Sequence, residues 1–158
     1  MERKTALITG ATSGIGEACA RRFANGGYNI IITGRTADKL QALKAELETE
    51  GVSVLALAFD VCDRNATREA VNSIPDSFKP IDVLINNAGI ARGLEPEYEG
   101  SFQDWDEMID TNIKGLLNMT RLVVPQMVSF NHGHVINIGS VAGDAAYAGG
   151  GVYCATKA

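Results

Sequence analysis

Tyr153 and Lys157 stand four residues apart near the end of a chain of 158 residues. On a helix, this spacing places both side chains on one face. A free tyrosine loses its proton only at about pH 10 and is therefore a poor base at neutral pH. An ammonium group about 5 Å away favours the tyrosinate by roughly 3 kcal/mol at an effective dielectric constant of about 20. The pair could therefore donate and accept a proton, although pairs with this spacing are also common by chance.

Two further polar residues could act with this pair. Ser140 follows a short apolar run and could hydrogen-bond the same substrate oxygen as Tyr153. Asn112 lies on an apolar helical stripe, where its amide must find partners. Two interpretations of Asn112 stay open: an amide that kinks the helix or satisfies the core, or an anchor for a water molecule near Lys157.

A glycine-rich segment, residues 9–16, lies where the first predicted strand turns into the first predicted helix. Gly10, Gly14 and Gly16 allow a tight turn and a close approach to an anion, and the helix N-terminus offers free N–H groups. A Walker-type phosphate loop is excluded, because Glu17 follows Gly16 where that motif requires lysine. The segment predicts a dinucleotide phosphate site, and the alternative is a plain strand-to-helix turn.

The end of the second predicted strand indicates which dinucleotide is bound. Nucleotide-binding folds commonly place a carboxylate there to hold the ribose 2′-hydroxyl. This chain has Arg35 instead. A guanidinium suits a 2′-phosphate, and a charge-assisted hydrogen bond contributes roughly 1.5–3 kcal/mol. We therefore expect NADP as the cofactor, and the alternative is that Arg35 is only an exposed charge.

Short apolar runs predict the elements that position these residues. Five runs, at residues 5–9, 30–33, 54–59, 83–85 and 135–138, are apolar on both faces, which is typical of strands in a parallel sheet covered by helices. The segments between them have helical periodicity, and the longest runs from about Phe102 toward Pro125, which we expect to kink or end it. The pattern predicts an α/β fold, a doubly wound parallel sheet in a Rossmann-like three-layer arrangement.

The same periodicity predicts which helix faces are buried. The apolar face of the first helix is expected at Ile15, Ala18, Cys19 and Phe23, and that of the long helix at Trp105, Ile109, Ile113 and Leu116.

Composition excludes several classes of protein. Hydrophobic residues make up 46% and charged residues 21%, which rules out a disordered, collagen-like or coiled-coil chain. The net charge of −5 leaves no basic surplus for nucleic acid or an anionic membrane. No apolar stretch is long enough to span a bilayer, and we expect no secretory signal from the segment Met1 to Lys4 onward.

The cysteines and histidines predict neither disulfides nor a metal site. Cys19, Cys62 and Cys154 are an odd number without metal-ligand spacing, which fits reduced thiols and a cytoplasmic location. His132 and His134 have no third ligand nearby in sequence. We expect Cys154 to pack rather than react.

These motifs, in this order, resemble the short-chain dehydrogenase/reductase family along the whole chain. The resemblance implies that Asp60 and Val61 contact the adenine ring, and that residues 86–89 support the central strand beside the cofactor. It implies a catalytic tetrad of Asn112, Ser140, Tyr153 and Lys157, with Ser140 and Tyr153 also contacting substrate. The cofactor-binding residues it implies are Gly10, Ala11, Thr12, Ser13, Gly14, Ile15, Gly16, Arg35, Asp60, Val61, Asn87, Ala88, Gly89, Tyr153 and Lys157.

Within the family, residues 104–115, 131–140 and 147–153 are similar to those of the NADP-dependent 3-hydroxy acid dehydrogenases. That branch implies a metal-free oxidation of the β-hydroxyl of serine, allo-threonine or related acids, or the reduction of malonic semialdehyde. It also implies a homo-oligomer, a dimer or a tetramer. Ser13 departs from the basic residue of many NADP-dependent members, and Asp144 to Ala146 are smaller than usual beside the substrate.

Two alternatives stay open: an oxoacyl or general carbonyl reductase of the same family, and a non-catalytic dinucleotide-binding module.

The chain ends at Ala158, one residue after Lys157, whereas family members continue with further strands and helices. We therefore expect residues 1–158 to be a dinucleotide-binding domain that is incomplete at its C-terminal end, with its sheet truncated after the fifth strand. A polypeptide ending there would hold Tyr153 and Lys157 in a fraying last turn and expose the edge of the fifth strand. We expect such a polypeptide to bind NADP(H) weakly and to turn over no hydroxy acid.

Overall fold

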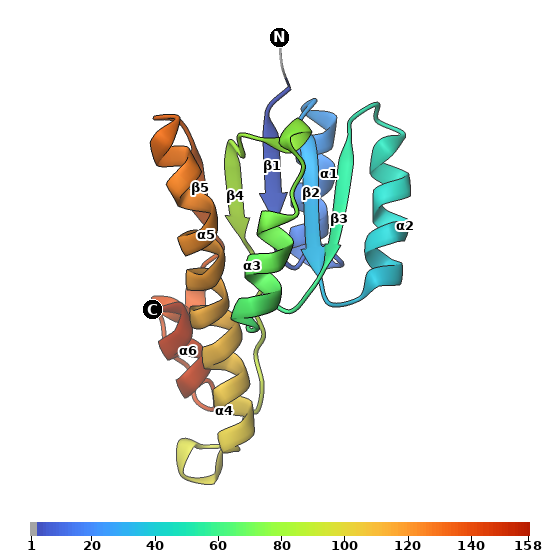
Figure 1. Cartoon of the computed structure of the whole chain (residues 1–158). Coiled ribbons are helices and arrows are strands. Elements are labelled where there is room, and N and C mark those ends of the chain that lie inside the picture. Colours follow the sequence, from blue (N-terminus) through green and yellow to red (C-terminus); the bar gives the residue numbers. More distant parts are fainter. Residues whose placement is uncertain (1–2) are drawn as a thin grey trace.

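Five parallel strands form one sheet in the computed structural model, which describes residues 3–158 (Figure 1). Their order in the sheet is β3-β2-β1-β4-β5, which confirms the predicted doubly wound α/β arrangement. Met1 and Glu2, the start of the segment for which we expect no secretory signal, lie outside the described residues. The strands are β1 (Thr5–Ile8), β2 (Asn29–Gly34), β3 (Val54–Ala58), β4 (Val83–Asn86) and β5 (His134–Asn137).

Helices cover both faces of this sheet. The helices α1 (Gly14–Asn25) and α2 (Ala37–Glu48) pack on one face, and α3 (Arg64–Asn72) and α5 (Leu116–Ser129) on the other. Figure 1 shows α3 and α5 in front of the sheet and α1 behind it. The helices α4 (Phe102–Ile109) and α6 (Gly151–Lys157) extend beyond the carboxyl ends of the strands.

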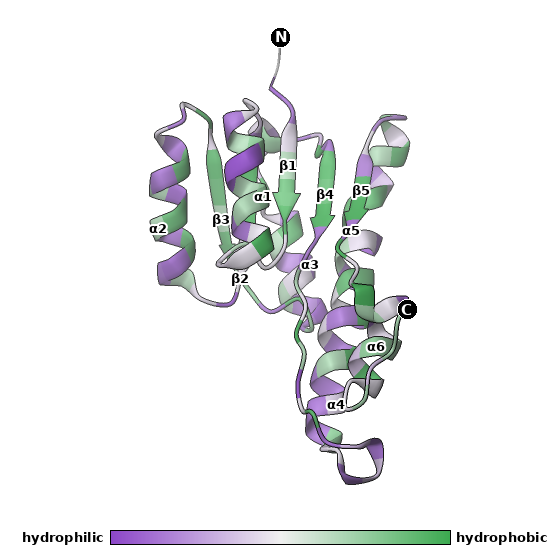
Figure 2. Cartoon of the chain, turned by 180° about the vertical axis from the view of Figure 1, so that it is seen from behind, coloured by the Kyte–Doolittle hydropathy of each residue, from purple (hydrophilic) through white to green (hydrophobic). Residues whose placement is uncertain are grey.

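The alternation of side chains along the strands divides the core in two. In β2, Ile30 and Ile32 face the helices α1 and α2, whereas Ile31 faces the side covered by α3 and α5, and all three are fully buried. Figure 2 shows the consequence, because the strands are hydrophobic and the outer helix faces are hydrophilic. Burial on both faces explains why the strands appear in the sequence as continuous apolar runs.

The buried face of α1 differs from the predicted face. Small residues at a spacing of four, Gly16, Ala20 and Ala24, lie against the sheet, whereas Ile15 and Ala18 are exposed. Cys19 and Phe23 of the predicted face are half-buried and pack against this core. The prediction was wrong at Ile15 and Ala18 because the close approach of the helix to the sheet favours the smallest side chains.

The long helix also buries a different stripe. It consists of α4, a π-helical turn η3 (Asp110–Gly115) and α5 in direct succession. Ile109 and Ile113 of the predicted stripe are exposed, and Trp105 and Leu116 are half-buried. The buried positions are Met108, Asn112, Gly115, Met119, Val123 and Met127. The wider π-helical turn changes the angular spacing of residues, which a pattern based on a uniform α-helix does not represent.

Pro125 does not end the helix, contrary to one of the two outcomes expected for it. It lies inside α5, which continues to Ser129. A proline removes one backbone N–H and keeps a helical φ angle. The buried side chains of Val123 and Met127 hold the helix on the sheet on either side of that missing donor.

None of the helices within residues 3–158 combines the length and the apolar character needed to cross a membrane.

Two valines of α5 provide a matched test of this packing. Val123 is 0% exposed and Val128 is 72% exposed. We expect Val123→Ala to lower the free energy of unfolding by about 2 kcal/mol, because it removes two buried methyl groups and leaves a cavity. Val128→Ala should change it by less than about 0.5 kcal/mol. Urea denaturation measures both values, and equal losses would contradict the assigned orientation of α5.

Candidate active site

A cleft of about 500 Å³ lies at the carboxyl ends of the strands. It spans the point where the sheet order reverses, because β1 lies between β2 and β4. Open α/β sheets bind ligands at such switch points. The predicted residues that line the cleft are Gly10, Thr12, Ser13, Gly14, Ile15, Arg35, Asp60, Val61, Asn87, Ala88, Gly89, Tyr153 and Lys157. Ala11, Gly16, Asn112 and Ser140 are not among its lining residues.

The glycine-rich loop between β1 and α1 forms a cradle in this cleft. Gly10 and Gly14 have φ angles of 63° and 56°, which side chains disfavour. A methyl group on Gly10 would lie 2.9 Å from the Cα of Ala88, and one on Gly16 would overlap the carbonyl oxygen of Gly10. The Ser13 side chain makes no capping hydrogen bond to α1. The first N–H groups of α1 therefore remain available to a phosphate, and the cradle fits a dinucleotide.

Thr9 joins the loop to the end of β4. Its hydroxyl accepts hydrogen bonds from the N–H groups of Asn87 and Ala88, each at 3.0 Å, and donates one to the carbonyl of Ile85 at 3.3 Å. The side-chain amide of Asn87 donates back to the carbonyls of Thr9 and Gly10 at 2.9 and 3.0 Å. Sequence reasoning did not assign Thr9 a role, although a buried threonine before Gly10 is a detectable signal.

Charged and polar groups lie together at the end of β2. The guanidinium of Arg35 lies 4.0 Å from the carboxylate of Asp60, and their side chains are 68% and 44% exposed. An ion pair this exposed contributes little stability, so Arg35 stays available to an incoming anion. The hydroxyl of Thr33, a lining residue, is buried without a hydrogen-bond partner in the described part of the chain. This set fits a ligand with polar groups and a phosphate at that end of the cleft.

Helix α6 brings Tyr153 and Lys157 to the other end of the cleft. The ammonium of Lys157 donates to the carbonyl of Ile138 at 3.1 Å. A methyl group on Gly89 would lie 3.3 Å from that ammonium, so Lys157 also adjoins the end of β4. Tyr153 lines this cleft and a neighbouring pocket of about 430 Å³ that includes Arg92 and other residues. A substrate in that pocket would meet Tyr153 and the cleft together.

Ser140 directly precedes a short 3-10 turn, η4 (Val141–Gly143), and caps it. Its hydroxyl oxygen accepts a hydrogen bond from the N–H of Ala142 at 3.2 Å. The hydroxyl hydrogen is therefore free to be donated. Ser140 follows Gly139, which lines the cleft.

Asn112 ties three segments together from inside the π-helical turn. Its amide oxygen accepts from the N–H of Ile90 at 2.8 Å, and its amide nitrogen donates to the carbonyl of Ile90 and the hydroxyl of Thr156, each at 2.9 Å. Asn112 is 5% exposed. These bonds support the interpretation as an amide that satisfies the core, and they link η3, the loop after β4 and α6. The water anchor stays a prediction.

The cysteines do not form a reactive group. All three are free, and Cys154 is buried, as expected for a packing residue. Burial raises the pKa of the Cys62 thiol, and its hydrogen bond with Thr111 opposes that shift. Cys62 therefore stays protonated at neutral pH. Within residues 3–158, no group of three or more His, Cys, Asp or Glu residues is placed to hold a metal ion.

Comparisons with known proteins agree with this geometry. The family model described as short chain dehydrogenase matches residues 4–158. The NADP-dependent 3-hydroxy acid dehydrogenase YdfG of Salmonella typhi is 56% identical over 152 residues, which are 96% of this chain and 60% of that protein. The serine 3-dehydrogenase of Agrobacterium fabrum is 49% identical over 154 residues, which are 98% and 60% of the two chains.

Solved structures show the same likeness. The crystal structure of serine dehydrogenase from Escherichia coli has a TM-score of 0.92 and 51% identity, and the match covers 97% of this chain and 69% of that one. The closed form of serine dehydrogenase complexed with NADP+ has the same score and identity and is covered to 60%. This chain therefore spans about 60% of the length of the curated relatives it matches.

Two threonines at strand ends test the junction between β1 and β4. We expect Thr9→Val to lower the free energy of unfolding by about 2–4 kcal/mol, because two backbone N–H groups lose a buried acceptor. Thr33→Val is the matched control, since the Thr33 hydroxyl has no partner to lose within the described residues. It should leave the unfolding free energy of the unliganded chain unchanged or raise it. Chemical denaturation without cofactor measures both, and a larger loss for Thr33→Val would contradict this account.

Proposed function

This chain belongs to the short-chain dehydrogenase family, and from that premise we propose that it binds NADP(H) and transfers a hydride to or from a small 3-hydroxy acid. In this proposal, residues 1–158 act as a dinucleotide-binding domain. One observation carries it: Tyr153 of α6 lines both the glycine-loop cleft and the neighbouring pocket, and Lys157 of the same helix lines the cleft. A binding module alone would not need Tyr153 at that boundary.

The relatives support the choice of substrate class. Two of them are described as a 3-hydroxy acid dehydrogenase and a serine 3-dehydrogenase. We therefore propose serine, allo-threonine and 3-hydroxypropionate, or malonic semialdehyde in the reverse direction, as the substrates to test. An oxoacyl or general carbonyl reductase would use the same residues and is the alternative within the family.

The proposed chemistry assigns one task to each residue of the tetrad. The nicotinamide of NADP, when bound, supplies the hydride acceptor. Tyr153, as the tyrosinate, takes the proton of the substrate hydroxyl. Lys157 lines the cleft with its positive charge and would contact the ribose of the bound cofactor. Ser140 donates its free hydroxyl hydrogen to the substrate oxygen, and Asn112 holds a water molecule for proton exchange or, through its three bonds, the geometry of α6.

The cofactor-binding residues follow from the cleft. The loop from Gly10 to Gly16 would hold the pyrophosphate at the N-terminus of α1, and Arg35 would pair with the 2′-phosphate. Asp60 and Val61 would contact the adenine, with Asn87 to Gly89 beside the nicotinamide half. No metal ion is needed for this reaction.

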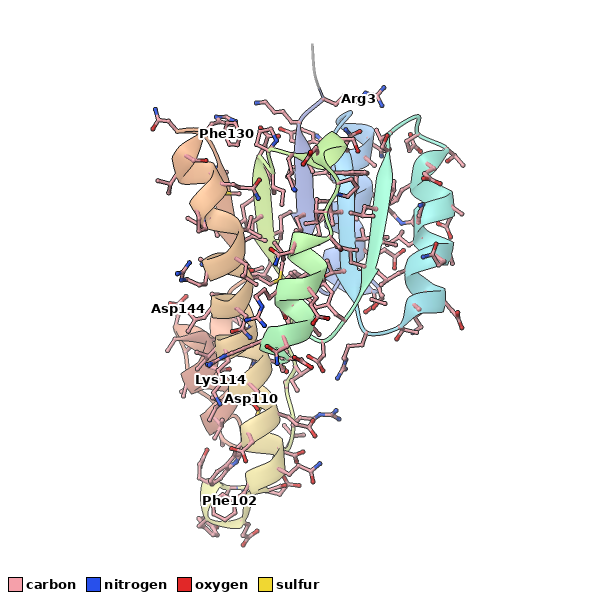
Figure 3. The ribbon with its side chains drawn as sticks, viewed as in Figure 1. Arg3, Phe102, Asp110, Lys114, Phe130 and Asp144 are labelled. Carbon is pink, nitrogen blue, oxygen red and sulfur yellow. The ribbon has the colours of Figure 1, made fainter. Side chains whose placement is uncertain are left out.

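We also propose that the protein assembles as a homodimer or homotetramer in the cytoplasm. The exposed apolar side chains Phe102, Ile109, Ile113 and Leu117 recur along α4, η3 and α5 at spacings of seven, four and four. Figure 3 shows Phe102 at the end of this helical unit, away from the sheet. A second copy of the chain would cover this apolar surface. The free cysteines suit a reducing compartment.

A substrate panel with the protein in its full natural length tests the proposal. Serine, allo-threonine and 3-hydroxypropionate are offered with NADP+, and an oxoacyl thioester and simple ketones with NADPH, while NADPH absorbance is followed. Turnover of the hydroxy acids supports the proposal. Turnover of only the thioester or the ketones favours the reductase, and turnover of none favours the non-catalytic module.

Cofactor selection gives the first prediction from this proposal. We expect Arg35→Ala to weaken NADP(H) binding by about 10- to 100-fold and NAD(H) binding by less than about threefold, because only NADP(H) carries the 2′-phosphate. Arg22→Ala, an exposed arginine in the last turn of α1, should change neither. Fluorescence titration of both cofactors measures the dissociation constants, and an equal loss for the two cofactors would contradict the role of Arg35.

Proton transfer gives the second prediction. We expect Tyr153→Phe to lower kcat by about 10²- to 10⁴-fold, because it removes the hydroxyl that moves the proton. Its cofactor dissociation constant should stay within about twofold of the wild type, since a single hydroxyl is lost. Lys157→Met, in contrast, should weaken cofactor binding in addition to lowering kcat. Tyr28→Phe is the control, because Tyr28 packs against Phe23 on α1. Steady-state kinetics in which Tyr153→Phe keeps full turnover would contradict the catalytic role of Tyr153.

A further inference from the structure

The segment between β4 and α4 packs against Gly149, just before α6, and Gly151, its first residue. A methyl group on Gly149 would overlap the carbonyl oxygen of Leu94, and one on Gly151 would overlap the carboxylate oxygen Oε1 of Glu97. Both glycines and Glu97 line one small pocket together with Tyr153. Figure 1 shows this segment and the start of α6 at the same end of the molecule, beyond the sheet. Glu97 therefore reaches across to the helix that carries the proposed catalytic pair.

The residue at the N-terminal cap position of α6 makes no side-chain capping hydrogen bond. The residue before α6, Gly150, has no side chain, and α6 has no side-chain capping hydrogen bond. The first N–H groups of a helix have no partner within it, and an anion beside them is stabilised by the helix dipole. The carboxylate of Glu97 lies against Gly151, the first residue of α6. The carboxylate therefore occupies the space beside the first residue of α6 that a side chain at position 151 would need.

A glycine at position 151 also needs an explanation. Alanine stabilises a helix relative to glycine, and the φ angle of Gly151 is not in the left-handed region. The backbone of α6 therefore gains nothing from glycine at this position. The absence of a side chain instead gives the carboxylate of Glu97 its place.

We propose that Glu97 is a positioning residue for the proposed reaction: its carboxylate, seated against Gly151, sets where α6 begins and so aligns Tyr153 with the cleft. Tyr153 is two residues beyond Gly151, so a shift of the helix start moves the phenol directly. A displacement of about 1 Å at a reacting group can cost about 100-fold in rate. The expected change in rate rests on the proposed function. The contact between Glu97 and Gly151 is independent of that function.

The test is a double-mutant cycle in the protein at its full natural length. We expect Gly151→Ala to lower kcat by about 10- to 100-fold, because the new methyl group expels Glu97. Glu97→Ala alone should lower it by about 3- to 10-fold. In the double variant, Gly151→Ala should cause no further loss, since the methyl group then has room. KM for the cofactor should stay within about twofold throughout, because the glycine-rich loop is untouched.

Two controls sharpen the cycle. Glu99 belongs to the same short 3-10 turn, η2 (Glu97–Glu99), and is exposed like Glu97, but it does not line the pocket that Glu97 shares with Gly151. Glu99→Ala combined with Gly151→Ala should therefore stay as slow as Gly151→Ala alone. Glu97→Gln keeps the shape and one acceptor oxygen of the side chain, so it should retain kcat within about threefold. Additive losses in the cycle, rescue by Glu99→Ala, or a Glu97→Gln variant as slow as Glu97→Ala would each overturn the proposal.

Thermal unfolding separates this inference from the proposed function. Gly151→Ala should lower Tm by about 3–6 °C in the wild-type background and leave it unchanged or raise it in the Glu97→Ala background, where only helix propensity acts. This reversal of sign is measurable even if no hydroxy acid is turned over. The absence of turnover in the wild type would then count against the proposed function, and the absence of the reversal against the contact between Glu97 and Gly151.

Discussion

The hydroxyl of Thr9 holds together the two strands between which the cleft opens. At this point the chain leaves β1 for α1, and β4 continues on the other side into the segment 87–91. Both segments turn away from the sheet, so their backbone N–H and C=O groups no longer find hydrogen-bond partners on a neighbouring strand. Thr9 satisfies two N–H groups of the β4 side, and Asn87 satisfies two carbonyls of the β1 side. The shape of the cradle depends on this exchange, because Ala88 and Asn87 occupy the space that side chains on Gly10 and Gly16 would need.

A second set of bonds attaches the late part of the chain to this centre. Asn112 reaches the loop after β4 through Ile90 and reaches α6 through Thr156. Lys157 is bound in turn to the carbonyl at the end of β5. The π-helical turn places the amide of Asn112 on the buried side of the helix, where the buried positions on either side are Met108 and Gly115. Three elements distant in sequence therefore meet around one buried amide, and the charge of Lys157 is fixed relative to the glycine-rich loop.

The sequence was sufficient for the strands and the cleft, and insufficient for the helix faces. Strands buried on both faces appear as continuous apolar runs, so the strands and the position of Arg35 at the end of the second one could be predicted without a structure. Asp60 and Asn87 were added by the family resemblance. The buried face of α1 could not be predicted, because its packing depends on a close contact far from any sequence pattern. Gly16 lies so close to the carbonyl oxygen of Gly10 that a methyl group there would overlap it. The stripe of the long helix was misplaced because a π-helical turn interrupts the α-helical period. The contact between Glu97 and Gly151 joins positions 54 residues apart and carries no local pattern at all.

Electrostatics explains how an acidic chain can bind an anionic cofactor. The net charge of −5 is unfavourable to a dinucleotide phosphate at long range, but solution ions screen charges beyond about 8–10 Å. Within that distance the cleft presents three positive groups: the N-terminus of α1, Arg35 at one end and Lys157 at the other. The only carboxylate that lines the cleft, within the part of the chain described, is that of Asp60, and one of its oxygens accepts the N–H of Cys62. The local arrangement therefore decides binding, and the surplus of acidic residues lies outside the cleft, where it does not oppose an anion.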